Sequence, residues 1–150
     1  MENAEILLVE DNPYDVELAL HAFKKNRIAN SIHVLRDGAE ALDYIFCRGA
    51  YAERRIEDQP KVILLDLKLP LVDGLEVLRQ IKSDPCTQAI PVVVLTSSRQ
   101  DPDIVKSYKL GVNSYIVKPV ELGQFSEAVQ NLGLYWLRYN QSSPPDPDDC

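Results

Sequence analysis

The sequence has no long hydrophobic run and no basic, apolar leader. None of its apolar runs approaches the roughly 20 residues that a membrane-spanning helix needs. The first ten residues, MENAEILLVE, lack the basic segment followed by an apolar one that marks a secretory signal. We therefore expect a cytoplasmic protein that makes no membrane contact.

Cysteine is scarce as well. Cys47, Cys86 and Cys150 are an odd number of widely separated residues, and no CxxC pair occurs. A disulfide framework or a cysteine-based metal site usually shows paired spacings, so we expect free thiols, as in most cytosolic proteins.

Basic charge is in deficit. The chain has 16 Lys and Arg residues against 23 Asp and Glu residues, which gives a formal net charge of −7. Because nucleic acid backbones and anionic membranes attract basic surfaces, this balance argues against direct binding to either.

The composition that remains is that of one globular domain. The 150 residues are 45% hydrophobic and 26% charged, which is ordinary for such a domain. We expect the domain to cover residues 1–138 and a disordered tail, rich in Pro, Ser and Asp, to cover residues 139–150. The polar stretch 48–59 is long for a connection between a helix and a strand, and it is either a solvated insertion or a partner contact.

The stretch KVILLDLKLPLVDG, residues 61–74, organises the rest of the chain. Residues 61–65 form an apolar run without alternation, which is typical of a strand buried on both faces. The run ends on Asp66, and a proline and an Asp-Gly pair then supply turn chemistry before helix-spaced apolar residues begin. Asp66 is therefore expected at the carboxyl end of a buried strand, where ligands collect in open α/β sheets.

Five apolar runs are candidates for strands, and segments with helical spacing follow them. The predicted strands cover residues 5–9, 31–36, 61–65, 91–95 and 113–117. This alternation predicts a doubly wound α/β fold, in which a parallel sheet carries helices on both faces. Five such units fit the flavodoxin-like strand order 2-1-3-4-5, which opens a crevice between the first and third strands.

Acids from two strand ends would meet at that crevice. Glu10 and Asp11 follow the first strand, and Asp66 follows the third. Carboxylates about 4 Å apart repel one another by roughly 4 kcal/mol per pair at an effective dielectric constant near 20, so a cation or a bound proton is needed. Hard oxygen ligands, few in number and with room for water, suit Mg²⁺.

A hydroxyl and an ammonium group join the acids. Thr96 lies at the end of the fourth strand and Lys118 at the end of the fifth. An acid, a divalent cation, a hydroxyl and a lysine around one point suit phosphoryl transfer, with Asp66 as the nucleophile. Alone, each residue also has an ordinary role, as a helix cap, a turn residue or a solvated lysine. Their joint placement at four strand ends favours a shared site.

Together these motifs resemble the signature of the receiver domains of two-component response regulators. The resemblance covers about residues 5–139, and the motifs that carry it are Glu10-Asp11, Asp66 with Pro70 and Asp73-Gly74, Thr96-Ser97, and Lys118-Pro119. It implies that Asp66 accepts a phosphoryl group from a phosphohistidine on a sensor histidine kinase.

The resemblance also implies how the site is completed. It implies that the Mg²⁺ ligands are Glu10, Asp11, Asp66 and the backbone carbonyl of Lys68. It further implies that the bond between Lys118 and the following proline is cis, which would aim the ammonium group inward.

Two positions would report phosphorylation if the resemblance holds. They are Thr96, whose hydroxyl moves toward the phosphoryl group, and Tyr115, whose ring swings inward; Tyr115 could instead be an ordinary aromatic at the sheet edge. Lys68 and Ser98 flank the path of attacking water in this family, so we expect them to affect the lifetime of the phosphoryl group.

Three segments narrow the resemblance to the small stand-alone regulators that partner cyanobacterial and other bacterial phytochromes. They are residues 48–60, residues 98–119 and Tyr135-Trp136. Such regulators often form homodimers through their fourth helix, fifth strand and fifth helix. Phe125, Tyr135 and Trp136 could supply apolar surface there, although each of them could instead belong to the core.

The leading hypothesis is a phosphorylation-dependent switch that is no enzyme toward external substrates. Its output would come from dimerisation, from docking, or from passing the phosphoryl group to a downstream phosphotransfer protein. The alternative is an aspartyl-phosphate phosphatase on a related fold, which needs a second acid where this chain has Lys68. A flavin carrier would need a phosphate loop in place of Glu10-Asp11, and a phosphate-independent receiver would lack signature residues.

Overall fold

Five short apolar segments form one parallel sheet. The computed structural model describes residues 4–25, 31–119, 121–146 and 148. The strands are β1 (Ile6–Val9), β2 (Ile32–Leu35), β3 (Val62–Leu65), β4 (Val92–Thr96) and β5 (Ser114–Val117). Their order is β2-β1-β3-β4-β5 and every pairing is parallel, so the predicted flavodoxin-like order is confirmed.

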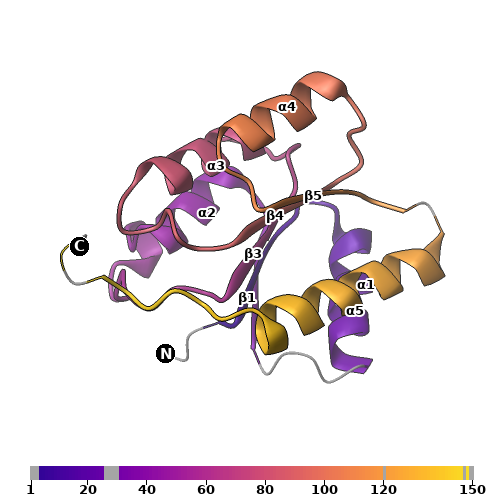
Figure 1. Ribbon diagram of the computed structural model, residues 1–150, viewed down its shortest axis with the longest axis horizontal. Helices are drawn as coiled ribbons and strands as arrows, with labels where there is room; N and C mark the ends of the chain where they lie inside the picture. Colours follow the sequence, from indigo (N-terminus) through magenta and orange to yellow (C-terminus); the bar gives the residue numbers. More distant parts are fainter. Residues whose placement is uncertain (1–3, 26–30, 120, 147, 149–150) are drawn as a thin grey trace.

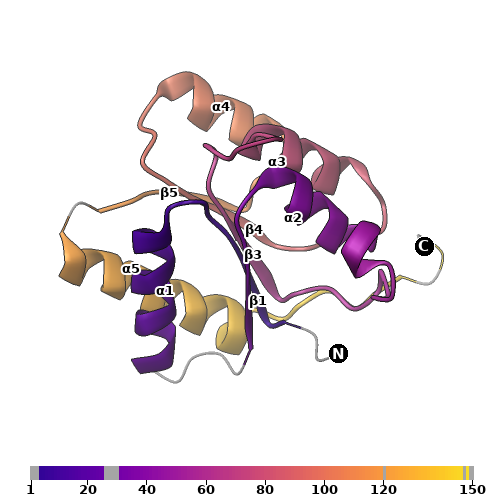
Figure 2. The same cartoon turned by 180° about the vertical axis from the view of Figure 1, so that it is seen from behind.

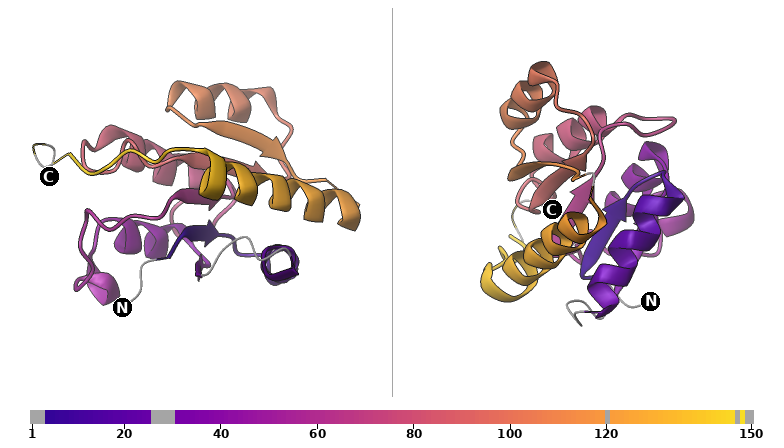
Figure 3. Two further views of the ribbon diagram at one scale, coloured as in Figure 1. Left: turned by 60° about the horizontal axis from the view of Figure 1, so that its bottom comes forward. Right: turned by 90° about the vertical axis from the view of Figure 1, so that its right-hand side faces the viewer.

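Helices cover both faces of the sheet. On one face lie α1 (Pro13–Lys25) and α5 (Leu122–Leu134), and on the other lie α2 (Gly38–Ile45), α3 (Gly74–Ser83) and α4 (Asp101–Lys109) (Figures 1 and 2). Helices α1 and α5 pack against each other, as the right-hand view of Figure 3 shows. One buried hydrophobic cluster fills each face, because the central strands β1, β3 and β4 send apolar side chains to both.

The parallel strands give the sheet two chemically different edges. The carboxyl edge carries the loops that leave the strands, including residues 10–12 after β1, 66–73 after β3 and 97–100 after β4. The amino edge carries the loops that enter the strands, including residues 84–91 before β4 and 110–113 before β5. Side chains that follow strand ends therefore gather at one edge only.

The polar stretch 48–59 is fixed to helix α2. It contains one short 3₁₀ turn, η1 (Gly49–Tyr51), and no continuation of the helix. The guanidinium carbon of Arg54 lies 3.7 Å from the centre of the Tyr44 ring, and the group donates a 2.6 Å hydrogen bond to the carbonyl of Asp58. The hydroxyl of Tyr51 donates to Glu40 at 2.9 Å. These contacts describe an anchored insertion, and its role as a partner contact stays a prediction.

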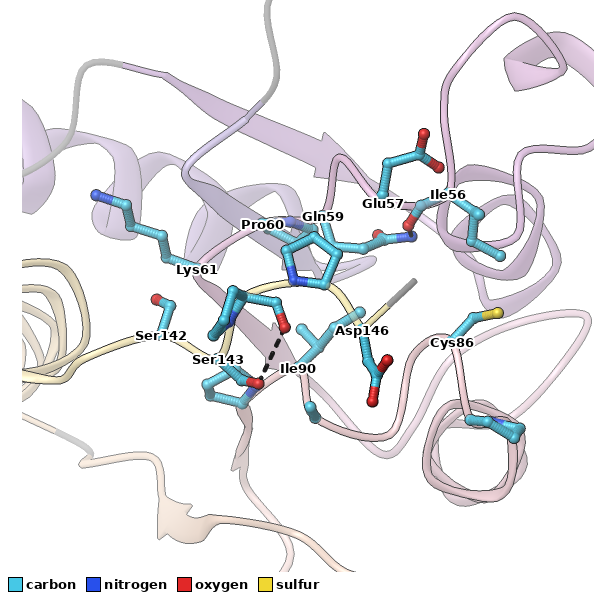
Figure 4. A pocket seen from close by; sticks show the side chains of 15 residues that line it. Ile56, Glu57, Gln59, Pro60, Lys61, Cys86, Ile90, Ser142, Ser143 and Asp146 are labelled. Carbon is cyan, nitrogen blue, oxygen red and sulfur yellow. Dashed lines mark hydrogen bonds between the residues drawn. The ribbon is translucent and has the colours of Figure 1, made fainter. Parts of the chain in front are cut away.

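The chain after α5 departs from a simple tail. A π-helical segment, η2 (Tyr135–Tyr139), continues α5, and no helix or strand is assigned to residues 140–146. Ser142–Asp146 line a cavity of about 210 Å³ at the amino edge, opposite residues that include Gln59, Pro60 and Ile90 (Figure 4). Disorder of this tail stays a prediction.

One expectation about cysteine is wrong. Cys47 is a free cysteine, but Cys86 is disulfide-bonded, and Cys150 lies outside the described residues. The number and spacing of cysteines are only an indirect guide to disulfide bonding, because residues far apart along the chain can meet in space, and the expectation of free thiols therefore fails for Cys86. Within the described part of the chain, no helix is both long and apolar enough to cross a membrane.

Candidate functional site

The first two acids of the site come from neighbouring strands. Val9 of β1 lies beside Leu65 of β3 in the sheet register, so the residues that follow them, Glu10 and Asp66, are neighbours. The backbone N–H of Asp66 donates to the carbonyl of Val9 at 3.0 Å, which fixes the relative height of the two strand ends. The crevice predicted between the first and third strands therefore holds both acids.

Three carboxylates form a cluster at this point. Glu10, Asp11 and Asp66 each offer an oxygen atom, and these atoms lie within 4.8 Å of one another. Glu10 is 4% exposed and Asp66 is 7% exposed, whereas Asp11 faces solvent. Two buried acids and one exposed acid leave an open side for water, and such an oxygen donor set is consistent with a divalent metal site.

Asp66 accepts three hydrogen bonds at the centre of the site. Its Oδ1 accepts from the hydroxyl of Thr96 at 2.7 Å and from the backbone N–H of Lys68 at 3.3 Å. Its Oδ2 lies 3.3 Å from Nζ of Lys118. Thr96 is the last residue of β4 and is fully buried, so its hydroxyl has a fixed direction. The structure thus brings together the predicted acid, hydroxyl and ammonium group.

Lys118 reaches the cluster from the strand on the far side of β4. Its ammonium group donates to Glu10, to Asp15 at 2.8 Å and to Asp66 at 3.3 Å. The expected cis bond to Pro119 is wrong, because no cis peptide bond occurs in the described chain, which includes both residues. The length of the lysine side chain alone carries the charge inward from a trans backbone.

Asp15 is a member of the site that sequence reasoning missed. It lies in the first turn of α1, where an acid is usually explained by the positive end of the helix dipole. The helix begins directly after the cluster, because Asn12 caps it by accepting the N–H of Tyr14 at 2.9 Å. The signal in the sequence is the short separation between Asp15 and the acids that follow β1. Because α1 begins directly after these acids, an acid in its first turn lies close to them.

Burial and charge shift the pKa values of the site in different directions. Burial raises the pKa of Glu10 to about 7, and the charge of Asp66 adds to the rise while Lys118 opposes it. Burial acts in the same sense on Asp66, but the charge of Lys118 and the hydrogen bond from Thr96 outweigh it, so its pKa lies below the usual value. At neutral pH the Asp66 side chain is therefore an ionised carboxylate.

The pKa of Lys118 moves the other way from that of an ordinary buried lysine. Burial acts to lower it, but hydrogen bonds to Asp15 and Glu10 and the charge of Asp66 outweigh burial and raise the pKa above its usual value. The ammonium group is therefore charged over the whole neutral range, and its charge is shared among three acids.

The loop after β4 links the site to helix α4. The backbone N–H of Ser98 donates to the Thr96 hydroxyl at 3.4 Å, and the carbonyl of Ser98 accepts from the hydroxyl of Tyr115 at 3.0 Å. The Ser98 hydroxyl donates to Asp103 of α4 at 2.6 Å. Ser98 is thus a buried link between the site and α4, and its place beside the path of attacking water stays a prediction. Tyr115 is partly buried and bonded to this loop.

The remaining predicted residues fall into two groups. The side chain of Lys68 is exposed, and its backbone carbonyl stays a predicted metal ligand. Phe125 is 4% exposed and packs in the core, because the helical period places it on the inward face of α5 with Val129; it is therefore no dimer contact in this structure. Tyr135 is 52% exposed and Trp136 is half-buried, so both stay candidates for contact surface.

The fold and the acid cluster define a class of signalling protein. The chain matches the response regulator receiver domain family over residues 6–130, and it belongs to that family. The family is the one that the strand-end motifs resemble, and it consists of two-component response regulators.

Similar proteins place the chain among regulators of its own size. It is 44% identical over 140 residues to the probable methanogenesis regulatory protein FilR2 of Methanothrix harundinacea, an alignment that covers 93% of this chain and 88% of FilR2. It is 41% identical over 132 residues to the response regulator Rcp1 of Synechocystis, over 88% of each chain.

Solved structures agree with this placement. The Mn²⁺-bound form of Rcp1 has a TM-score of 0.86 at 38% identity, covering 95% of this chain and 99% of that one. The phosphorylated cyanobacterial phytochrome response regulator RcpA also has a TM-score of 0.86, at 41% identity, covering 94% of this chain and 99% of that one.

Proposed function

We propose that the chain accepts a phosphoryl group on Asp66 from a phosphohistidine of a sensor histidine kinase. The observation that carries this proposal is the setting of the Asp66 carboxylate, which accepts from Thr96 at 2.7 Å and lies 3.3 Å from the Lys118 ammonium group. An ionised acceptor beside a donor hydroxyl and a mobile cation is what phosphoryl transfer requires, since the protein contributes mainly position and charge. The phosphorylated state of the similar regulator RcpA supports it.

The transfer itself balances with the groups that the chain supplies. An oxygen atom of Asp66 attacks phosphorus, the phosphorus–nitrogen bond to the donor histidine breaks, and its electron pair returns to the imidazole nitrogen. The Thr96 hydroxyl, which donates to Asp66, can turn to donate to an oxygen of the transferred group. Lys118 can follow the new negative charge, because Glu10, Asp15 and Asp66 share its charge.

A magnesium ion fits the acid cluster. Glu10, Asp11 and Asp66 would hold it, together with the backbone carbonyl of Lys68. When bound, Mg²⁺ supplies positive charge that offsets the phosphoryl oxygens. The similar regulator Rcp1 has a Mn²⁺-bound form, which supports the binding of a divalent ion by this chain.

The kinase is a phytochrome in this proposal, because RcpA is a phytochrome response regulator and is 41% identical to this chain. Output passes from Thr96 through Ser98 to α4, and then to a homodimer contact over α4, β5 and α5 or to a downstream phosphotransfer protein. The exposed Tyr135 and the half-buried Trp136 contribute to that surface. Sedimentation of the unphosphorylated and phosphorylated chain measures whether the dimer depends on phosphorylation.

The chain is no phosphatase toward external esters. A phosphatase that forms an aspartyl phosphate needs a general acid two residues after its nucleophile, and the exposed Lys68 stands at that position. We expect no turnover of p-nitrophenyl phosphate above the rate of the buffer. Multiple turnovers by the wild-type chain that disappear in Asp66→Asn would instead support the phosphatase.

The acceptor is tested with two phosphodonors and two matched variants. Wild type, Asp66→Asn and Asp73→Asn are labelled with acetyl phosphate and Mg²⁺, and then with autophosphorylated sensor kinases of the host, phytochromes included. Asp73 is an exposed acid in the same loop that caps α3, a role that asparagine also fills. We expect labelling of wild type and Asp73→Asn and none of Asp66→Asn. Equal labelling of all three proteins would remove Asp66 from its role.

A further inference from the structure

The loop after β3 contains a strained turn. Leu71 has a φ of +69°, a conformation that L-residues other than glycine rarely adopt. The N–H of Val72 donates to the carbonyl of Pro70 at 2.9 Å, which makes Leu71 the centre of a γ-turn of the positive-φ kind. Such turns are rare because the β-carbon is crowded, and glycine would fill the position without this cost.

The turn is held in this shape from both sides. The carbonyl of Pro70 also accepts the N–H of Gly38 at 3.2 Å, and a β-carbon on Gly38 would lie 1.7 Å from the carbonyl oxygen of Val72. On the other side, the N–H of Gly74 donates to the carbonyl of Leu67 at 2.8 Å. The neighbouring start of α2 and the start of α3 therefore enforce the strain, and the loop cannot relax it alone.

The strained turn presents an apolar side chain to solvent. Leu71 is 81% exposed, more than any other large hydrophobic residue in the described chain. A single exposed leucine is ordinary on a protein surface. A leucine that is both strained and exposed is different, because neither backbone conformation nor packing favours it, and such a combination indicates use by a partner.

The position of the turn indicates which partner. The loop begins at Asp66 and returns to it, because a β-carbon on Gly74 would lie 2.3 Å from the carbonyl oxygen of Asp66. Asp66 is only 7% exposed, so a phosphohistidine carried by a protein must approach over the rim of the carboxyl edge. Leu71 lies on that rim, five residues after the acceptor, and the exposed Tyr14 lies just after the acids of β1.

We propose that Leu71 is a docking residue for the kinase domain that presents the phosphohistidine, and that the strained turn holds its side chain outward for that contact. The proposal rests on the proposed role of Asp66 as acceptor. The partner would cover Leu71 with an apolar side chain next to its histidine. Covering one leucine corresponds to about tenfold to hundredfold in affinity.

Two donors separate docking from chemistry. Acetyl phosphate is too small to need Leu71, whereas the autophosphorylated kinase that labels wild type fastest must dock. Leu71→Gly removes the side chain and the strain, and Leu71→Asn keeps a branched side chain in a residue that tolerates positive φ but is polar. For both variants we expect acetyl phosphate labelling within about twofold of wild type, and a KM for the regulator in kinase transfer that rises about tenfold or more at nearly unchanged kcat.

Two further variants, Leu71→Met and Tyr139→Ala, are the controls. Leu71→Met keeps an apolar side chain and should retain most of the kinase transfer. Tyr139 is an exposed aromatic residue beyond α5, and its removal should change neither reaction. A wild-type KM for Leu71→Gly and Leu71→Asn would overturn the proposal, and so would equal losses with both donors, which would place Leu71 in the geometry of the site. A wild-type chain that neither donor labels would instead overturn the proposed function.

Discussion

Two partly buried lysines, one at each edge of the sheet, have opposite surroundings. At the carboxyl edge, Lys118 contacts three carboxylates and its pKa is raised. At the amino edge, Lys82 donates to three neutral oxygens, the carbonyls of Gln88 and Ile90 and the amide oxygen of Asn113, at 3.0, 2.7 and 3.1 Å. Burial lowers the pKa of Lys82 to about 8. The two lysines therefore differ in the charge of their contact partners and in the direction in which their pKa is shifted.

The difference separates a charged candidate site from a structural contact. Lys118 offsets a surplus of negative charge that a metal ion could also offset, so its partners can be exchanged. Lys82 ties the end of α3 to the entrances of β4 and β5, since Asn113 also accepts the N–H of Val92 at 2.8 Å. Its partners have no net charge and nothing replaces them. The two edges should therefore respond differently to mutation, metal and pH.

Removal of Lys118 should give the largest effect. Lys118→Met leaves buried carboxylates without their counter-charge, which we expect to lower the free energy of unfolding by about 3–5 kcal/mol at pH 7.5. Mg²⁺ should restore part of this loss because it replaces the missing charge. The measurement is urea unfolding at two Mg²⁺ concentrations that differ about tenfold. Lys82→Met is the control, because Mg²⁺ should not change its free energy of unfolding. Equal Mg²⁺ responses in the two variants would contradict the comparison.

The loops of the carboxyl edge should tolerate a β-carbon less well than those of the amino edge. Gly38→Ala places a β-carbon 1.7 Å from the carbonyl oxygen of Val72, and we expect a loss of about 3 kcal/mol. Gly111→Ala meets the Lys82 side chain no closer than 3.5 Å and suffers only from a φ of +98°, so about 1 kcal/mol is expected. Urea unfolding of both variants measures these losses of unfolding free energy. A larger loss in Gly111→Ala than in Gly38→Ala would contradict the expected difference between the edges.

The lowered pKa of Lys82 predicts a pH dependence of stability. Its folded pKa of about 8 lies below the unfolded value, so the unfolded chain binds more protons in the window above pH 8. The stability that Lys82 contributes should therefore rise as pH rises from about 8 to 10. The difference in unfolding free energy between wild type and Lys82→Met measures it. A constant difference across the window would mean that the three oxygen acceptors fully compensate burial.

Asp15 should give the smallest effect. Asp15→Asn removes one partner of Lys118, which frees the ammonium group for an incoming phosphoryl group. Because the Asp15–Lys118 pair is partly exposed, we expect an initial rate of labelling by acetyl phosphate that is about twofold faster, which corresponds to a barrier lower by about 0.5 kcal/mol. Glu17→Gln removes the same charge from an exposed position on α1 and is the matched control. Equal acceleration in both variants would mean that general charge, and not Lys118, is responsible.

The fold and most of the site could be predicted because both depend on local patterns. Apolar runs without alternation identified β1, β3 and β4, which are buried on both faces. The rule that parallel strands end at one edge then brought Asp66, Thr96 and Lys118 together, and the structure has them in contact. These inferences needed no knowledge of distances.

The features that could not be predicted depend on how neighbouring segments meet. The pairing of Lys118 with Asp15 requires the direction in which α1 leaves β1, and the strain at Leu71 requires the approach of Gly38 to Val72. For Phe125 the sequence left both a contact surface and the core open, and the structure shows the core. Its spacing with Val129, which places both residues on the inward face of α5, is the signal that favours the core.

The hydrogen bond between Thr96 and Asp66 has a consequence for background signalling. The threonine already touches the acceptor before any phosphoryl group arrives, at 2.7 Å. In the proposed function, the motion left for activation is therefore short, because the hydroxyl that would turn to the phosphoryl group already lies at the acceptor. The contrast between the resting and the phosphorylated state would then depend mainly on the presence of the phosphoryl group, so the background signal would depend on how fast that group is lost.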